Sequence, residues 1–131
     1  MKRLLDCTAS DFQKMNGQDL KQSIQACEGR VMLSETMTSV APLYPSVTNA
    51  ELASAFGADL LLLNLFDVFN PAVEGVECDQ NESVIQKVKE LTGRPVGLNL
   101  EPVDLHAEQI EKLDTVSKGR LATEESLREA R

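Results

Sequence analysis

The sequence predicts an α/β fold in which about three parallel strands follow two helices. Three apolar runs, at residues 31–35, 60–65 and 96–101, are separated by stretches that can form helices. The run at 60–65 lacks regular polar alternation, which is typical of a strand covered on both faces and therefore of a parallel sheet. It begins 29 positions after residue 31 and 35 positions before residue 95, about the length that a strand, a crossover helix and two loops require. The spacing therefore indicates repeated strand-helix units.

Two helices are expected before the first strand. A short helix can begin at Ser10 or Asp11 and end at Met15. Asn16 can cap a second helix, which Gly29 would end. The inward stripe of the second helix would consist of Leu20, Ile24 and Cys27.

The segments between the strands carry helix start signals. Thr48 and Glu51 have the spacing of a capping box, which predicts a helix over residues 49–56. Asp79 and Glu82 repeat that spacing before a second helical stretch. Both connections between the strands are therefore expected to be helical.

Further helix signals follow the second connection. Gly93 is expected to end its helix before the third strand. Residues 107–113 look helical, and His106 just before them is expected to have a surface or helix-start role. Thr123 would cap a last helix over residues 124–130, which has acidic residues in its first turn.

Two architectures fit this order of elements. The strand-helix rhythm would next give a fourth strand, but no apolar run follows the last predicted helix. The chain would then be the first part of an eight-stranded (β/α)8 TIM barrel, which typically needs about 250 residues. The alternative is a small open three-stranded α/β domain. We expect the partial barrel, as a single domain over residues 1–131.

Composition and charge narrow the class of partner. Hydrophobic residues make up 42% and charged residues 26% of the 131 residues, which fits a globular protein. The net charge of −8 and the lack of a large basic cluster argue against nucleic acid. The apolar runs are too short to span a membrane, and the start of the chain lacks the pattern of a signal peptide. We expect a cytoplasmic protein with neither a nucleic-acid nor a membrane partner.

Several segments carry a family resemblance. They are residues 33–36, 49–53, 56–59, 64–67, 95–102 and 119–123. Their order resembles an uncharacterised bacterial family of (β/α) barrels, whose members are often labelled phosphoenolpyruvate-phosphonomutase-like or haloacid-dehalogenase-like. The resemblance covers nearly the whole chain but about half of a family member, and the Gly-rich, phosphate-loop-like turn of the family is absent. It implies a lyase or a mutase/isomerase that forms an enolate from a small keto acid, phosphonate or phosphorylated metabolite.

Three carboxylates mark the predicted site, because Glu35, Asp67 and Glu101 each lie at the end of an apolar run. In parallel α/β folds, ligands bind beyond the carboxyl ends of the strands. Three carboxylates in one cleft repel one another unless a cation or raised pKa values relieve the charge. Mg²⁺ is therefore the expected cofactor, with these residues as catalytic groups and metal ligands. No nucleotide-binding motif is present, so no nucleotide cofactor is indicated.

Polar residues within the first two strands are candidate substrate-binding groups. An unpartnered carboxamide at Asn64, inside an aliphatic run, would cost about 1 to 3 kcal/mol, so it needs a ligand or a neighbour such as Asn99. Ser34 and Thr36 offer hydroxyl donors beside Glu35. Alternation alone does not decide whether Ser34 or Glu35 faces the interior.

The third strand has a polar and an apolar face. Gly97, Asn99 and Glu101 share one face, which we expect to point into the barrel, and the intervening residues point to the helices. Asn99 is therefore a further candidate substrate-binding residue. Glu101 has an alternative role in capping the loop before a proline, and Asp67 has one in capping the turn after the second strand.

Two functions remain open at this stage. The first is part of a barrel enzyme for a small-molecule metabolite, incomplete and inactive by itself. The second is a non-catalytic half-barrel that forms a homo-oligomer or pairs with a separate carboxyl-terminal half, because an open sheet leaves unpaired edges.

Overall fold

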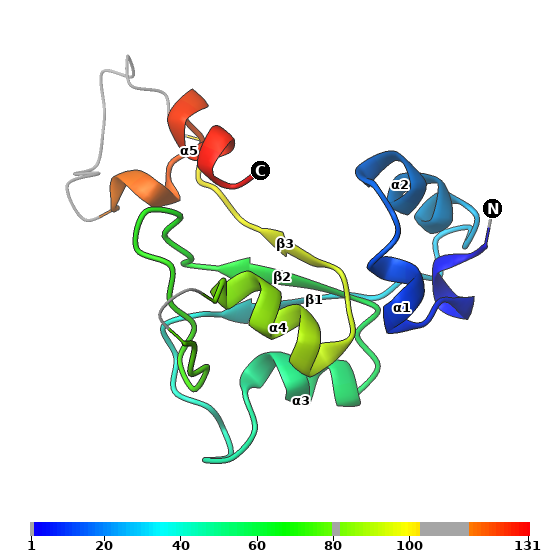
Figure 1. The fold of residues 1–131 in the computed structure, drawn as a ribbon, viewed down its shortest axis with the longest axis horizontal. Helices are drawn as coiled ribbons and strands as arrows, with labels where there is room; N and C mark the ends of the chain where they lie inside the picture. The colour runs from blue at the N-terminus through cyan, green and yellow to red at the C-terminus, as the bar shows by residue number, and fades with distance from the viewer. Residues whose placement is uncertain (1, 80–81, 103–115) are drawn as a thin grey trace.

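The computed structural model describes residues 2–79, 82–102 and 116–131, and it contains a three-stranded parallel sheet. The strands β1 (Leu33–Met37), β2 (Leu60–Asn64) and β3 (Val96–Leu98) lie side by side in the order of the sequence (Figure 1). A single parallel bridge between Glu101 and Leu121 extends the pairing beyond β3. The predicted α/β fold and the parallel sheet are confirmed, in the form of the small open sheet.

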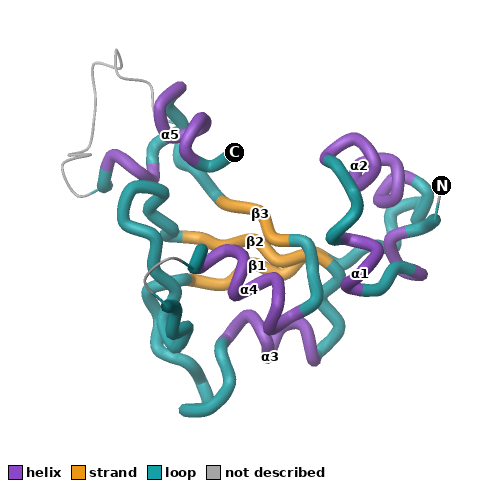
Figure 2. Tube along the Cα trace, viewed as in Figure 1, coloured by secondary structure: helices purple, strands orange, loops and turns teal. Residues whose placement is uncertain are grey.

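Helices precede, connect and follow the strands (Figure 2). The helices α1 (Ala9–Phe12) and α2 (Gly17–Gln25) come before β1, as predicted, and the short 3₁₀ turn η1 (Leu4–Asp6), which was not predicted, precedes them. The connections contain α3 (Asn49–Ala55) and α4 (Val84–Thr92), and the turn η3 (Lys118–Arg120) and α5 (Glu124–Glu129) follow β3. None of these helices is long and apolar enough to cross a membrane.

Most helix caps follow the predicted signals. The first helix instead begins after Thr8, and the second ends at Gln25, before Gly29. Asn16 and Thr48 form capping boxes at α2 and α3, and Thr123 accepts a hydrogen bond from a first-turn N–H of α5. The predicted capping box from Asp79 is wrong, because Ser83 is the residue that caps α4. Gly93 ends α4 in the left-handed conformation (φ 63°), as the sequence indicated.

The strands differ from their predicted bounds. β1 lies two residues later than predicted, and β2 ends at Asn64 because Leu65 adopts a left-handed φ of 63°. β3 contains only three residues, and Glu101 rejoins the sheet through its bridge to Leu121. The carboxyl edge of the sheet is therefore built from short strands and the loops that follow them.

Helices α3 and α4 both cover one face of the sheet (Figure 1). This helix-covered face holds the buried core, in which Leu61 packs with Val88 of α4, and Leu63 packs with Phe66. Val96, Leu98 and Leu100 point to the same core, which confirms the prediction for that face of β3. The other face, here called the open face, carries Leu33, Glu35, Met37, Leu60, Leu62, Asn64, Gly97, Asn99 and Glu101.

Candidate functional site

Two asparagines meet at the carboxyl end of β2 and β3, on the open face. Leu63 and Leu98 are partners in the sheet, so Asn64 and Asn99, one residue further along, lie side by side. Asn99 Nδ2 donates a hydrogen bond of 3.2 Å to Asn64 Oδ1, which also accepts one of 2.7 Å from the Leu65 backbone N–H. Of the two partners considered for the Asn64 carboxamide, the structure provides Asn99.

Glu101 and Arg120 extend this pair. Asn99 Nδ2 also donates to Glu101 Oε1 at 3.4 Å, and Arg120 Nη2 lies 3.8 Å from the same oxygen. Two backbone hydrogen bonds align the segments, from Glu101 N to Arg120 O at 2.7 Å and from Ala122 N to Glu101 O at 2.8 Å. We call Asn64, Asn99, Glu101 and Arg120 the polar network.

The polar network combines a base with a cation at the edge where parallel α/β folds bind ligands. At 3.8 Å the guanidinium of Arg120 is too far from Glu101 for a direct hydrogen bond, and no other ion pair among the described residues includes it, so within these residues it has donors for another anion. The Arg120 side chain is 22% exposed and that of Glu101 38% exposed, which leaves both accessible to a small molecule. The arrangement can bind an anionic group and accept a proton beside it.

Asp67 lies at the same end of the sheet but is held in a turn. Its Oδ1 accepts hydrogen bonds from the backbone N–H groups of Phe69 at 2.8 Å and Asn70 at 3.1 Å. The Ser117 hydroxyl and these N–H groups hold the pKa of the Asp67 carboxyl below its usual value, although desolvation acts in the opposite direction. Gly119 packs directly on this carboxylate. These contacts correspond to the turn-capping alternative for Asp67.

A hollow of about 460 Å³ adjoins Asp67 between the loops that follow β1 and β2. Buried Thr38, exposed Ser39 and Glu74 also line it. None of the four residues of the polar network lines this hollow. The polar network therefore does not share this hollow, although Gly119, which packs on Asp67, directly precedes Arg120 in the chain.

The first-strand candidates divide between the two faces. Glu35 pairs with Leu62, whose partner is Gly97, and this places Glu35 on the open face. Glu101 lies four residues beyond Gly97, so the two carboxylates are separated by about 13 Å along the strand direction alone. Ser34 and Thr36 lie on the helix-covered face, away from the polar network.

The structure does not bring the three predicted metal ligands together. Among residues 2–79, 82–102 and 116–131, no group of three acidic, cysteine or histidine side chains is arranged to hold a metal ion. A Mg²⁺ ion needs oxygen ligands at about 2.0 to 2.1 Å, whereas Glu35, Asp67 and Glu101 occupy different places. This donor set does not fit the ion, so we assign no step to it, and the magnesium site stays a prediction.

Sequence reasoning missed two features of this edge. Arg120 joins the polar network only through the parallel bridge to Glu101, and nothing near it in the sequence signals that pairing. Leu65 is a non-glycine residue with positive φ, which typically costs about 1 to 2 kcal/mol. His106 and the predicted helix at 107–113 lie outside the described residues.

Comparison with known families gives a match over nearly the whole chain. A family described as a domain of unknown function, DUF7916, matches residues 5–131. The chain belongs to the DUF7916 family. No curated protein and no solved structure matches it. The family description assigns no chemistry to DUF7916, so the function must be inferred from the polar network.

Proposed function

We propose that this DUF7916 chain is the amino-terminal part of a (β/α) barrel enzyme that acts on a small anionic metabolite. The observation that carries the proposal is the polar network, which joins a carboxylate, two amides and a guanidinium on the open face at the carboxyl edge. The substrate class is a small keto acid, phosphonate or phosphorylated acid, and the reaction type is that of a lyase or a mutase/isomerase.

The order of strands and helices supports the barrel. In a barrel, successive parallel strands are neighbours, and every crossover helix lies on the outside. Here β1, β2 and β3 are neighbours in sequence order, and α3 and α4 lie on the same face. The open face then corresponds to the barrel interior, where bulky aliphatic side chains fill the lower layers. Bulky aliphatic side chains of this kind occur on the open face at Leu33, Leu60 and Leu62.

Each residue of the polar network has a chemical role in this proposal. Arg120 binds the anionic group of the substrate through its free guanidinium donors. Glu101 takes a proton from the carbon next to the keto group. The Asn99 N–H that bonds the ionised Glu101 carboxylate then turns to the enolate oxygen that develops. Asn64 holds the Asn99 amide in position. These steps use only the four side chains of the polar network.

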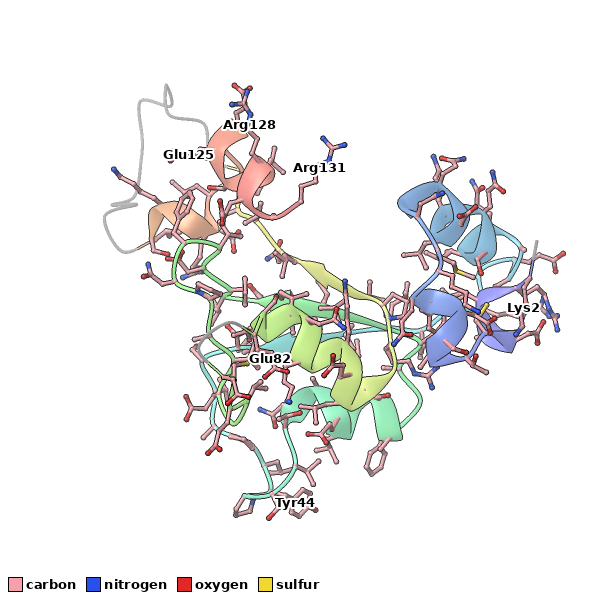
Figure 3. All side chains as sticks on the ribbon, viewed as in Figure 1. Lys2, Tyr44, Glu82, Glu125, Arg128 and Arg131 are labelled. Atoms are coloured by element: carbon pink, nitrogen blue, oxygen red, sulfur yellow. The ribbon has the colours of Figure 1, made fainter. Side chains whose placement is uncertain are left out.

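Isothermal titration with phosphonopyruvate, pyruvate and inorganic phosphate tests the binding step. We expect phosphonopyruvate to bind and Arg120→Gln to weaken its binding about tenfold or more, since a charge-assisted hydrogen bond contributes about 1.5 to 3 kcal/mol. Arg128→Gln is the matched control, because Arg128 pairs with Glu124 on α5 and points away from the sheet (Figure 3). Equal effects of the two substitutions, or no heat with any of the anions, would contradict the proposal.

The proton-transfer step has its own readout. Exchange of the C3 hydrogens of pyruvate in D₂O, followed by proton NMR, reports enolate formation without a complete reaction. We expect Glu101→Gln to abolish any catalysed exchange while binding of the anion persists. Hydrogen exchange that requires both Mg²⁺ and Glu101 would support the predicted metal cofactor. Exchange that is unchanged in Glu101→Gln would exclude Glu101 as the base.

A second candidate function is assembly, and the exposed apolar residues of the open face favour it. Leu33 is 52% exposed and Met37 53% exposed. The strand β1 forms one edge of the sheet, and the residues around Leu121, which pair with Glu101, extend the other edge. A two-fold axis parallel to the strands would place β1 of each copy beside the residues around Leu121 of the other copy, with the two segments parallel. We therefore take a second copy of the chain as the partner. Sedimentation equilibrium should show a dimer that Leu33→Lys dissociates, and a stable monomer at micromolar concentration would contradict it.

A further inference from the structure

We propose that a cavity at the amino end of the sheet binds an organic anion with an apolar body. This amino-end cavity has a volume of about 400 Å³, within the range of about 300 to 1,000 Å³ that is usual for small-molecule sites. The helices α1 and α2 and the end of α4, which line it, lie where the strands begin (Figure 1), whereas the polar network lies where the strands end. The proposal is therefore independent of the proposed enzymatic function.

Two parts of the chain that are distant in sequence form the cavity. One wall comes from α1, the following turn and the start of α2, and the other from the last turns of α4 and the start of β3. Gly93 makes this approach possible, because a Cβ at its position would lie only 3.2 Å from the Cβ of Ala9. Its left-handed φ of 63° also turns the chain from α4 toward β3. The cavity is thus a product of the tertiary fold.

The charges that line the cavity favour an anion. Lys89 and Arg94 line it together with a single carboxylate, Glu90. Glu90 accepts a hydrogen bond of 3.2 Å from Gln86, whereas no ion pair within the described parts of the chain includes Lys89 or Arg94. In a chain of net charge −8, this is a local excess of positive charge. An anionic ligand would supply the partner that both cations lack.

The guanidinium of Arg94 is partly oriented already. Its Nε donates to Ser54 Oγ at 3.4 Å, and Ser54 Oγ in turn donates to the Thr92 carbonyl at 3.2 Å. These contacts use one edge of the guanidinium and leave the terminal nitrogens for a carboxylate. A half-buried arginine held in this way loses less freedom on binding than an extended surface side chain does.

Apolar side chains define the rest of the ligand. Phe12, Met15 and Leu20 line one wall, and Pro95 and Val96 line the other. An aromatic or branched aliphatic group bound between these walls would be buried away from water. Its burial would contribute binding free energy roughly in proportion to the apolar surface area removed from water. A small inorganic anion offers no such surface. The cavity therefore selects a carboxylate on an apolar body over phosphate or sulfate.

Fluorescence anisotropy with naphthyl probes tests this site. The chain contains no tryptophan, so naphthalene emission can be followed without overlap from indole. The probes are 1-naphthylacetate, its neutral amide and 1-naphthylmethylamine, which share an apolar body and differ in charge. We expect saturable binding of the acetate, with the amide weaker by about tenfold and the amine weaker still.

Substitutions locate the binding. Arg94→Gln and Lys89→Gln should each weaken the acetate about tenfold or more. Lys87→Gln is the matched control, because Lys87 lies on the same helix, pairs with Glu82 and does not line the cavity. Circular dichroism confirms that each variant is folded, and amide shifts of Gly17 and Gly93 on NMR titration report the site directly.

Several results would overturn the proposal. They are equal binding of the acid and its amide, an effect of Lys87→Gln equal to that of Arg94→Gln, and the absence of binding by any probe. Loss of binding in Arg120→Gln would show that the anion binds at the opposite end of the sheet, outside this cavity. Failure of the proposed enzymatic function leaves the expected results unchanged, since the probes and the substitutions at Lys89, Arg94 and Lys87 do not involve the polar network.

Discussion

The two faces of the sheet differ in what they bury. On the helix-covered face, Leu61 is 1% and Leu63 0% exposed, because α3 and α4 lie over them. On the open face, Leu33 and Met37 remain about half exposed, although their side chains are equally apolar. Side chains of this type usually lie in a core. The difference indicates that the open face is suited to further contacts, as a barrel interior or an interface, with the polar network at its carboxyl end.

The largest expected effect comes from deleting a leucine side chain on each face of β2. Leu63→Ala should lower the free energy of unfolding by about 3 to 4 kcal/mol, because a fully buried leucine leaves a cavity. Leu62→Ala should cost about 1 kcal/mol in the isolated chain, since Leu62 is only partly buried. Urea denaturation of both variants measures the difference, and equal losses would mean that the open face is covered in solution.

Glycine substitutions give the next comparison. A Cβ at Gly119 would lie 1.8 Å from Asp67 Oδ1, so Gly119→Ala must displace that carboxylate from its turn. We expect a loss of about 2 kcal/mol. A Cβ at Gly97 on the open face would lie 3.4 Å from the Leu62 side chain and 3.9 Å from the Leu61 carbonyl oxygen, so Gly97→Ala should change stability by less than about 0.5 kcal/mol. Thermal denaturation of the two variants at the same pH checks this ranking.

A smaller effect should appear as a pH dependence from Asp67. Its pKa is lower in the folded chain than the usual 3.8, chiefly through the Ser117 hydroxyl, so its ionised form stabilises the fold. That stabilisation is present above pH 3.8 and is lost as the pH falls through the folded-state pKa. Asp67→Asn should therefore cost about 1 kcal/mol at pH 7 and progressively less in acid.

The control for this pH profile is an exposed carboxylate. Glu125→Gln on α5 removes the same charge from a solvent-facing position (Figure 3). Denaturation series between pH 7 and pH 2 should converge for Asp67→Asn and the unmodified chain but stay nearly parallel for Glu125→Gln. A constant difference for Asp67→Asn across this range would show that charge plays no part in its turn.

The smallest stability effect is expected at the polar network. Glu101→Gln should change the free energy of unfolding by about 0 to 1 kcal/mol, because a partly exposed pair at 3.8 Å contributes little. Chemical denaturation of this variant measures its free energy of unfolding, and so shows whether a loss of ligand binding is caused by a loss of stability. A loss of several kcal/mol would make Glu101 a structural residue and would weaken its proposed role as a base.

The local pattern of the sequence was enough to predict much of the fold. Capping at Thr48 and Thr123 and the end of α4 at Gly93 depend on residues close together in the chain. The parallel sheet was predicted from the continuous apolar run of β2 and from the spacing between the strands. The alternation of β3 also predicted that Asn99 and Glu101 share a face away from the core. These features follow from helix capping and from the two-residue period of a strand.

The parts that were not predicted depend on pairings between distant segments. The face of Glu35 is decided by its pairing with Leu62. The alternation of β1 does not reveal that face, because Ser34 and Thr36 face the helices while apolar residues share the open face with Glu35. Gly119 packs on the Asp67 turn, and Arg120 lies beside Glu101. Both contacts join residues that are far apart in the sequence, so no local sequence pattern predicts them. The prediction that three carboxylates converge assumed that the three strands end at the same height along the sheet. The strands are short and do not all end at the same height.

The central claim is that the polar network at the carboxyl edge of the open face binds a small anion. An NMR titration of the ¹⁵N-labelled chain with phosphonopyruvate tests it most directly, because the Asn99 side-chain amide lies between Asn64 and Glu101 and reports on the site. The account predicts saturable shifts of that amide that disappear in Arg120→Gln. Shifts confined to other parts of the chain, or an Asn99 amide that does not respond, would contradict it.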